Sequence, residues 1–317
     1  MHKLALELGR DIQPKTYDLA VIGHIVFDHI SHDNRVSETQ LGSPCVYSSL
    51  GARALGASVV VGSRVGSELN VDLGQLIRAG VNTDYVHRTD GSTTAFRIAY
   101  EHGIRRMWTV SRCRPLTRRD IADLPQSRSL HLGPILNEIP QSVAVLLTER
   151  DAITSLDPQG YLRKTLRDGR VGRAKWHDHK LLSRLDLLKV SEDEAAIILG
   201  GSASRRKLAR LGPEVVLITK GGSGTSVWSR EEGMFKVPAF KTRVRDPTGA
   251  GDALVGAMLV TWARTGDLLW SLAVGSAVAS FVVERVSPKN FGTRSRVEER
   301  ASVVFNATHK VHEKGVL

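Results

Sequence analysis

Cysteine is nearly absent from this sequence, which has only Cys45 and Cys113 among its 317 residues. Two cysteines are too few for a disulfide framework, and the residues around them do not have the spacing of zinc ligands. The expected location is therefore a reducing cytoplasm. His177 and His179 lack a third ligand at a useful spacing, so we do not expect them to bind a metal ion.

Long hydrophobic runs are also lacking. Residues 1–16 contain no apolar stretch of the length that a signal peptide needs, and we expect them to form an N-terminal extension. The segment Leu268–Val283 carries no charge but is short for a membrane span and rich in Gly, Ala and Ser. We therefore expect a helix that is buried against a sheet, and no membrane association.

Acidic residues are outnumbered, because 44 Lys and Arg stand against 33 Asp and Glu, which gives a net charge of +11 and a pI near 9.9. Such a balance favours anionic partners, which include nucleic acid and phosphorylated small molecules. The basic residues are scattered and no aromatic-interleaved RNA-binding motif occurs, so nucleic acid is not the expected partner. Solvated surface charge, as in heat-adapted proteins, is the alternative explanation.

Short apolar runs alternate with helical patterns along the chain, and this is typical of a mainly parallel α/β sheet. Each run ends in Gly, Pro, Asp or Ser, at the edge of the sheet where open α/β folds bind ligands. The runs lie at residues 17–26, 57–66, 129–135, 153–160, 185–191 and 214–222.

Two segments, at about residues 28–40 and 93–112, depart from this pattern and alternate polar with apolar residues. We expect turns at Asp33-Asn34 and His102-Gly103, and a small antiparallel sheet that projects from the main body. Such a sheet beside the ligand edge suggests a lid. Residues 17–317 are expected to form a single domain that includes this lid.

The stretch that indicates chemistry is Arg245–Leu259, RDPTGAGDALVGAML. Gly249, Ala250 and Gly251 precede Asp252 at the start of a helical pattern, where free N–H groups and the helix dipole favour an anion. A carboxylate beside a bound phosphate is unfavourable unless it accepts a proton from a nearby hydroxyl. The pattern therefore indicates phosphoryl transfer with Asp252 as the general base, although the same residues also suit a simple helix start.

This stretch closely resembles the carboxyl-terminal signature of the PfkB (ribokinase-like) family of small-molecule kinases, and other segments resemble that family in order from Tyr17 to about Glu299. The resemblance implies a three-layer αβα fold with a β lid. It also implies that Asp252 deprotonates the acceptor hydroxyl, while the backbone amides of residues 249–251 stabilise the transferring phosphoryl group.

The segment LITKGGSG resembles the family's T-x-G-x-x-G turn, which implies that Thr219, Gly221 and Gly224 bind nucleotide, with Lys220 as an extra cation. A glycine cluster between two strands is also an ordinary turn. Ser276 falls where many relatives carry an asparagine of the adenine site. No Walker motif or protein-kinase motif set occurs.

Substrate contacts are implied near the N-terminus. Asp28 resembles the family aspartate that binds substrate hydroxyls, although an acid at a strand end is also typical of a turn. The segment LGSPCVYSSLGARALG keeps Gly42, but Ser43 replaces a glycine and Tyr47 replaces the sugar-binding asparagine. A tyrosine there favours a cyclitol or a nucleoside over a simple pentose. The lid contributes further candidates: Phe96, Arg97 and Trp108.

Two more segments resemble family elements. Glu194 in LKVSEDEAAIILG corresponds to an acid that holds Mg²⁺ through water, with Ser191 in place of an asparagine. The same residues also form an S-x-x-E capping box. In SLDPQGYLR, Asp157 and Arg163 are kept and Gln159 replaces an asparagine, so Arg163 is a candidate phosphate contact.

These observations predict a kinase that uses ATP and Mg²⁺ to phosphorylate a hydroxyl of a small polyhydroxylated substrate: a sugar, a cyclitol such as myo-inositol, or a nucleoside. A homodimer through the lid strands is expected from the resemblance, because those strands otherwise leave open edges. One alternative is a non-catalytic, nucleic-acid-binding regulator, although such a protein does not need a base at Asp252. The other is a vitamin-type kinase acting on pyridoxal or a hydroxymethylpyrimidine, against which the lid and Asp28 argue.

Overall fold

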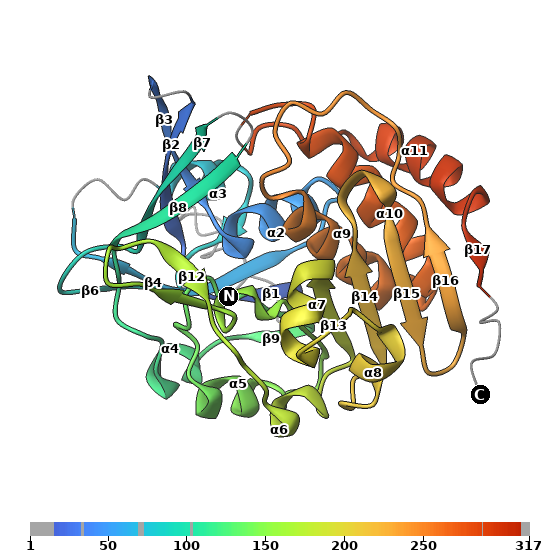
Figure 1. Cartoon of the computed structure of the whole chain (residues 1–317), viewed down its shortest axis with the longest axis horizontal. Coiled ribbons are helices and arrows are strands. Elements are labelled where there is room, and N and C mark those ends of the chain that lie inside the picture. The colour runs from blue at the N-terminus through green and yellow to red at the C-terminus, as the bar shows by residue number, and fades with distance from the viewer. Residues whose placement is uncertain (1–15, 33–34, 69–72, 102–103, 287, 312–317) are drawn as a thin grey trace, which may run out of the picture.

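One large sheet runs through the middle of the protein in a computed structural model, which describes residues 16–32, 35–68, 73–101, 104–286 and 288–311 (Figure 1). Counted in spatial order, the strands from β4 (Val59–Gly66) across the middle of the sheet to β14 (Val215–Thr219) pair in parallel. Beyond β14, the strands at the edge of the sheet pair antiparallel. In spatial order the strands are β17 (His309–Lys310), β16 (Gly233–Val237), β15 (Thr225–Ser229), β14 (Val215–Thr219), β13 (Leu187–Ser191), β10 (Ile153–Leu156), β9 (Gln126–Leu132), β1 (Thr16–Ile22), β4 (Val59–Gly66) and β5 (Val81–Asn82), with β6 (Val86–Thr89) also paired to β4.

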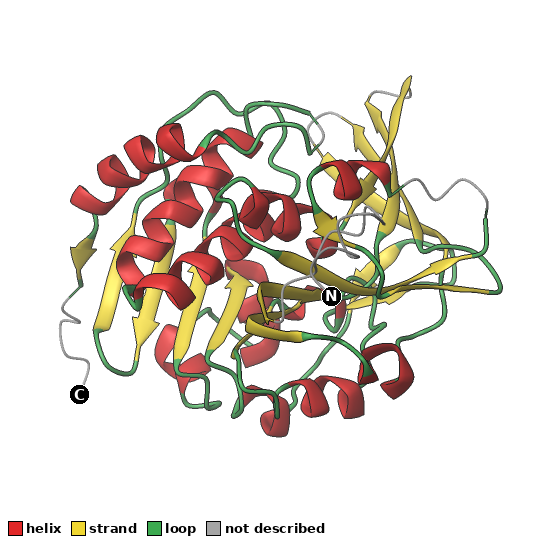
Figure 2. Cartoon of the chain, turned by 180° about the vertical axis from the view of Figure 1, so that it is seen from behind, coloured by secondary structure: helices red, strands yellow, loops and turns green. Residues whose placement is uncertain are grey.

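Helices cover both faces of this sheet, as Figures 1 and 2 show, because its central strands are apolar on both sides. In β1, Leu19 and Val21 face one core while Ala20 and Ile22 face the other. The first core is covered by α2 (Pro44–Arg53), α3 (Gly74–Arg78), α9 (Ala250–Thr265), α10 (Leu268–Val282) and α11 (Arg294–Asn306). The second is covered by α4 (Arg118–Ala122), α5 (Gln141–Leu147), α6 (His179–Leu182), α7 (Glu192–Leu199) and α8 (Arg205–Ala209). The predicted three-layer fold is confirmed.

The uncharged segment near the C-terminus forms the buried helix predicted for it. Helix α10 packs between α9 and α11, and Leu272 and Phe281 on it are fully buried. Among the helices in the described ranges, none has the length and apolar character needed to cross a membrane.

The predicted lid is a separate sheet in the order β3 (Arg35–Gly42), β2 (Val26–His32), β7 (Ala95–Glu101) and β8 (Ile104–Ser111). Both hairpins are antiparallel, and a parallel pairing of β2 with β7 joins them. A small hairpin of β11 (Arg163–Thr165) and β12 (Val171–Arg173) lies beside β8. Residues 1–15 of the predicted extension and the turns at residues 33–34 and 102–103 lie outside the described residues.

Candidate active site

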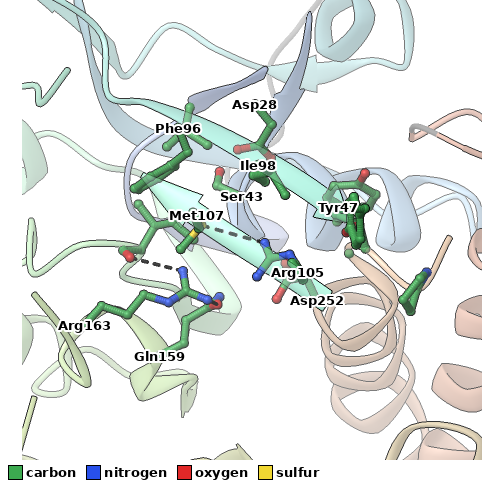
Figure 3. Close-up of a pocket in the computed structure, with 16 residues that line it drawn as sticks. Asp28, Ser43, Tyr47, Phe96, Ile98, Arg105, Met107, Gln159, Arg163 and Asp252 are labelled. Carbon is green, nitrogen blue, oxygen red and sulfur yellow. Dashed lines mark hydrogen bonds between the residues drawn. The ribbon is translucent and has the colours of Figure 1, made fainter. Parts of the chain in front are cut away.

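A cavity of about 260 Å³ lies under the lid, at the carboxyl edge of the large sheet (Figure 3). One wall of the cavity is formed by every second residue of the lid strands, on the face turned towards the main body. The start of α9 forms the opposite wall. We call this space the lid cavity. It is lined by Val26, Asp28, Ser43, Tyr47, Phe96, Ile98, Tyr100, Arg105, Met107, Ile135, Gln159, Arg163, Pro247, Thr248, Gly249 and Asp252.

The first turn of α9 presents both a carboxylate and an anion site. Gly249 is the residue that caps the helix, and Asp252 occupies its third position. The N–H groups of a first helical turn have no acceptor within the helix. Ala250 donates its N–H to the Pro247 carbonyl at 3.3 Å, which leaves the N–H groups of Gly251 and Asp252 as the better anion donors of the turn.

Gly249 cannot carry a side chain. Its φ of 74° lies in the left-handed region, and a Cβ atom would lie 2.1 Å from the Tyr47 ring. The ring of Tyr47 therefore packs directly on the loop backbone that precedes Asp252. Its hydroxyl is buried without a hydrogen-bond partner in the described part of the chain, and burial raises the pKa of Tyr47, so it remains available to donate to a ligand.

Beneath Asp252 lies a buried ion pair that the sequence did not reveal. The ammonium of Lys189, in the middle of β13, lies 2.5 Å from the Asp157 carboxylate, and a Cβ on Gly251 would be 3.0 Å from that ammonium. Lys189 and Asp157 are 8% and 1% exposed. A buried cation is therefore fixed directly under the anion site of α9.

The environment of Asp252 suits a general base. Burial raises the pKa of Asp252 to about 7, although the Lys189 ammonium opposes that rise. A carboxylate with a pKa near neutrality both ionises at physiological pH and accepts a proton readily. The Ser48 hydroxyl, on α2, donates to the Asp252 backbone carbonyl at 2.8 Å and so fixes this turn.

Asp28 lies on β2 in the roof of the cavity, next to β3. It is 6% exposed, and burial raises its pKa to about 6, opposed by the nearby Arg105. A Cβ at Gly42 would lie 2.1 Å from an Asp28 oxygen, so glycine there gives the carboxylate its space. The Asp28 carboxylate therefore lines the cavity as an acceptor of hydrogen bonds.

Ser43, which stands where the family motif has glycine, adopts a φ of 94° at the start of α2. This left-handed conformation is unfavourable for a residue with a side chain and costs roughly 1–3 kcal/mol. The serine thus keeps the backbone geometry that a glycine would give, and adds a hydroxyl to the cavity wall.

A second cavity, of about 430 Å³, lies on the other side of the α9 start, between β14 and α10. Its walls are largely apolar, from Phe240, Leu254, Ala279 and Val283. Four of the five residues predicted to bind nucleotide line this β14–α10 cavity, namely Thr219, Gly221, Gly224 and Ser276, and so do Ala250 and Gly251 of the predicted anion site. The Ser276 hydroxyl donates to the Pro238 carbonyl at 3.2 Å, whereas Lys220 forms an ion pair with Glu192 on the surface.

Glu194 is the third residue of α7 and forms the predicted capping box with Ser191. One of its oxygens accepts the Ser191 N–H at 2.7 Å, and the Ser191 hydroxyl accepts the Glu194 N–H at 3.3 Å. The half-buried carboxylate still acts on Asp252, whose pKa it raises. Within the described ranges, no group of three or more His, Cys, Asp or Glu residues is arranged to bind a metal ion. A Mg²⁺ ion here would rely mainly on phosphate oxygens, which is its usual mode of binding.

The family model described as pfkB family carbohydrate kinase matches residues 16–294 of the chain. The chain belongs to the pfkB carbohydrate kinase family. The enzymes of this family are kinases with alcohol acceptors, so the predicted enzyme class is confirmed.

Individual relatives resemble this pfkB kinase over most of its length. Inositol 3-kinase of Arabidopsis thaliana is 24% identical over 284 residues, which cover 86% of this chain and 75% of the relative. A pyrophosphate-dependent kinase in the ribokinase family, solved with a pyrophosphate analog and myo-inositol, is 23% identical with a TM-score of 0.77 and covers 89% of this chain and 99% of its own. Arabidopsis thaliana ribokinase, solved with ribose and ATP, is 19% identical with a TM-score of 0.73 and covers 90% and 99%.

The structure of the pfkB kinase thus brings together Asp28, Gly42, Ser43, Tyr47 and the first turn of α9. It does not bring Arg97 to them. Arg97 is exposed and stacks on Trp108 at 3.9 Å, while its neighbours Phe96 and Ile98 line the cavity. The alternation of a strand therefore points the Arg97 side chain away from the cavity.

Sequence reasoning missed three residues of this site: Lys189, Arg105 and Met107. The sequence did contain a signal for Lys189, because this lysine stands within the apolar run LDLLKVS. A lysine is rarely buried without a partner, so its position in a buried strand indicated an ion pair. Strand alternation pairs Arg105 and Met107 on one face of β8, but it does not say which face is inside.

Proposed function

We propose that this pfkB kinase transfers the γ-phosphoryl group of ATP to a hydroxyl of a small polyhydroxylated acceptor, a sugar, a cyclitol such as myo-inositol or a nucleoside, with Asp252 as the general base. One observation carries the proposal. The first turn of α9 separates two cavities, with Asp252 in the wall of the lid cavity and Gly251 in the wall of the β14–α10 cavity. Donor and acceptor thus approach the same turn from opposite sides.

The acceptor binds under the lid with its hydroxyls on Asp28 and beside Tyr47, so that one of them lies against Asp252. Asp252 accepts the proton of that hydroxyl as its oxygen attacks the γ-phosphorus, and the bond from this phosphorus to the β,γ-bridging oxygen breaks to release ADP. Negative charge on the transferring group is stabilised by the N–H groups at the start of α9 and by the Lys189 ammonium below them. The lid excludes water, which would otherwise compete as an acceptor.

ATP is the proposed donor because of the apolar walls of the β14–α10 cavity. A purine base stacks on such walls, whereas pyrophosphate does not need them. Glu194 is the residue that would hold a Mg²⁺ ion through water, and such an ion would offset the charge of the donor phosphates. We also propose a cytoplasmic homodimer that pairs through β3, the lid strand whose outer edge has no partner strand within the described ranges.

Asp252→Asn tests the proposal most directly. The substitution keeps size and hydrogen bonding but removes the base, so turnover of any accepted sugar, cyclitol or nucleoside should fall about 10²- to 10⁴-fold. Nucleotide binding, measured by calorimetry, should stay within about threefold of the wild type, because Asp252 lines the other cavity. Turnover close to that of the wild type would refute the assignment of the base.

A further inference from the structure

The lid cavity has a charge distribution that a neutral acceptor does not explain. Asp28 on β2 and Asp252 on α9 line the cavity together with two cations, Arg105 and Arg163 (Figure 3). Arg105 comes from lid strand β8 and Arg163 from β11 in the main body. Hydroxyl groups are satisfied by the carboxylates, by Tyr47 and by Ser43, and do not need two guanidinium groups.

These two arginines also line a second space. A groove of about 410 Å³ continues from the lid cavity, and Arg105, Met107, Gln159 and Arg163 belong to the walls of both. We call it the arginine groove, because Arg106, Arg170 and Arg173 line it as well, against the two acids Asp193 and Glu194. Arg105 and Arg163 therefore lie at the boundary that the two spaces share.

Neither Arg105 nor Arg163 has a carboxylate within ion-pair distance among the described residues. The Arg163 guanidinium donates to the Gln159 side-chain oxygen at 2.7 Å and to the Ile135 carbonyl at 3.3 Å. Arg105 contacts the Met107 sulfur at 3.7 Å. By contrast, Arg170 pairs with Asp168 at 2.6 Å and Arg173 with Asp193 at 2.7 Å.

The two guanidinium groups also repel one another. The pKa of Arg163 is lowered by burial and then by the charge of Arg105. Glu194, Asp157 and Asp252 oppose this lowering from a distance, but the groups in direct contact with the half-buried Arg163 are two neutral oxygen atoms. An anion between the two arginines removes the repulsion and accepts several charge-assisted hydrogen bonds, the strongest kind that proteins make.

We propose that the acceptor of this kinase is an acidic polyol, which carries a carboxylate or a phosphate group that binds between Arg105 and Arg163. Its anionic end faces the arginine groove and its reacting hydroxyl faces Asp252. The carboxylates Asp28 and Asp252 repel that anionic end, so the charges also set the direction in which the acceptor binds. This inference rests on the proposed function, since it names the substrate class of the same site.

Binding without nucleotide tests the inference separately from catalysis. Calorimetry compares neutral polyols with their acidic counterparts: myo-inositol with its monophosphate, and glucose with glucose 6-phosphate and with gluconate. We expect at least one acid to bind tenfold or more tightly than its neutral parent. Comparing the phosphorylated ligands with gluconate then shows whether the site prefers a phosphate or a carboxylate group. Equal or weaker binding of every acid would overturn the inference.

Arg105→Met tests whether the arginines produce that preference. The preferred acid should lose about 10- to 100-fold in affinity, which is the usual value of one or two charge-assisted hydrogen bonds, and Arg105→Lys should restore part of it. The control is Arg167→Met, which removes the same charge from an exposed position beside β11. The acid preference should survive in this control.

Kinetic measurements with ATP distinguish a role of Arg105 in binding the donor from a role in binding the acceptor. If Arg105 serves the donor, Arg105→Met raises KM for ATP and leaves the preference for acid over neutral acceptor unchanged, and the inference fails. If no acceptor is phosphorylated but the acid still binds through Arg105, the proposed function fails and the inference about the ligand stands.

Discussion

The Lys189 ammonium and the Asp157 carboxylate, 2.5 Å apart, form a buried ion pair directly beneath the first turn of α9. Lys189 also lowers the pKa of Asp252, so one lysine faces two carboxylates. Asp157 directly follows β10 and Lys189 lies within β13, and the parallel pairing of these two strands brings them together. Lys189 therefore neutralises the buried Asp157 carboxylate and also affects the pKa of Asp252, the proposed base.

Lys189→Met should therefore have two separable effects. Leaving Asp157 buried without its partner should lower the free energy of unfolding by about 3–5 kcal/mol, measured by urea denaturation. Loss of the cation should also raise the pKa of Asp252, so the acid limb of the kcat/KM profile should move to higher pH. Adding Asp157→Asn should recover part of the stability. An acid limb at its original pH in Lys189→Met would show that Lys189 does not act on the base.

The activity should depend on pH through Asp252, whose pKa burial raises to about 7. Only the ionised carboxylate accepts a proton, so kcat/KM should fall about tenfold per pH unit below that value and level off above it. Stability should change in the opposite sense. The pKa is higher in the folded chain than its ordinary value of 3.8, so this contribution to stability is fully present below about pH 4 and is lost as the pH rises through about 7. Asp252→Asn should therefore melt above the wild type at pH 8, and the two should converge at pH 4.

Gly249→Ala should damage activity more than its backbone conformation alone explains. The added methyl group would both occupy a left-handed position and overlap the Tyr47 ring. The matched control is Gly266→Ala at the other end of α9, where φ is 72° and a Cβ would meet no atom within 4 Å. We expect the control to lose about 1 kcal/mol of stability and to keep its kcat. Equal effects of the two substitutions on kcat would contradict the role of the Tyr47 contact.

Filling the β14–α10 cavity should act on the donor alone. Ala279→Phe places a ring in the apolar wall of that cavity, so KM for ATP should rise about tenfold or more while KM for the acceptor stays constant. Val303→Phe at an exposed position of α11 is the surface control. Should pyrophosphate support turnover that Ala279→Phe leaves intact, the donor assignment would be wrong.

The fold was predictable because local patterns and the sheet agree. Apolar runs such as VVLIT and the uncharged helix of residues 268–282 are buried wherever they occur in an α/β protein, so their pattern was sufficient. The motif around Asp252 also suits a simple helix start, and it indicated a phosphoryl-transfer site only together with the other segments that resemble the family in the same order.

What the sequence could not show depends on tertiary packing. Arg97 and Arg105 are both lid arginines, yet strand register places Arg105 at the cavity and Arg97 against Trp108 outside it. Both faces of the lid carry polar residues, so alternation alone did not identify the inner face. Similarly, the partner of Lys189 lies 32 residues away on the neighbouring strand and becomes apparent only from the pairing of β10 with β13.

Helices α2 and α9 cross with their backbones in contact. A Cβ on Gly256 would lie 2.0 Å from the Ser48 carbonyl oxygen, and one on Gly51 would lie 2.8 Å from that of Ala253. The acceptor wall and the base thus come from segments about two hundred residues apart that fit only each other. During synthesis, α2 therefore leaves the ribosome about two hundred residues before the helix against which it packs. A nascent or truncated chain that ends before Gly249 lacks both the proposed base and the helix that holds α2 in place.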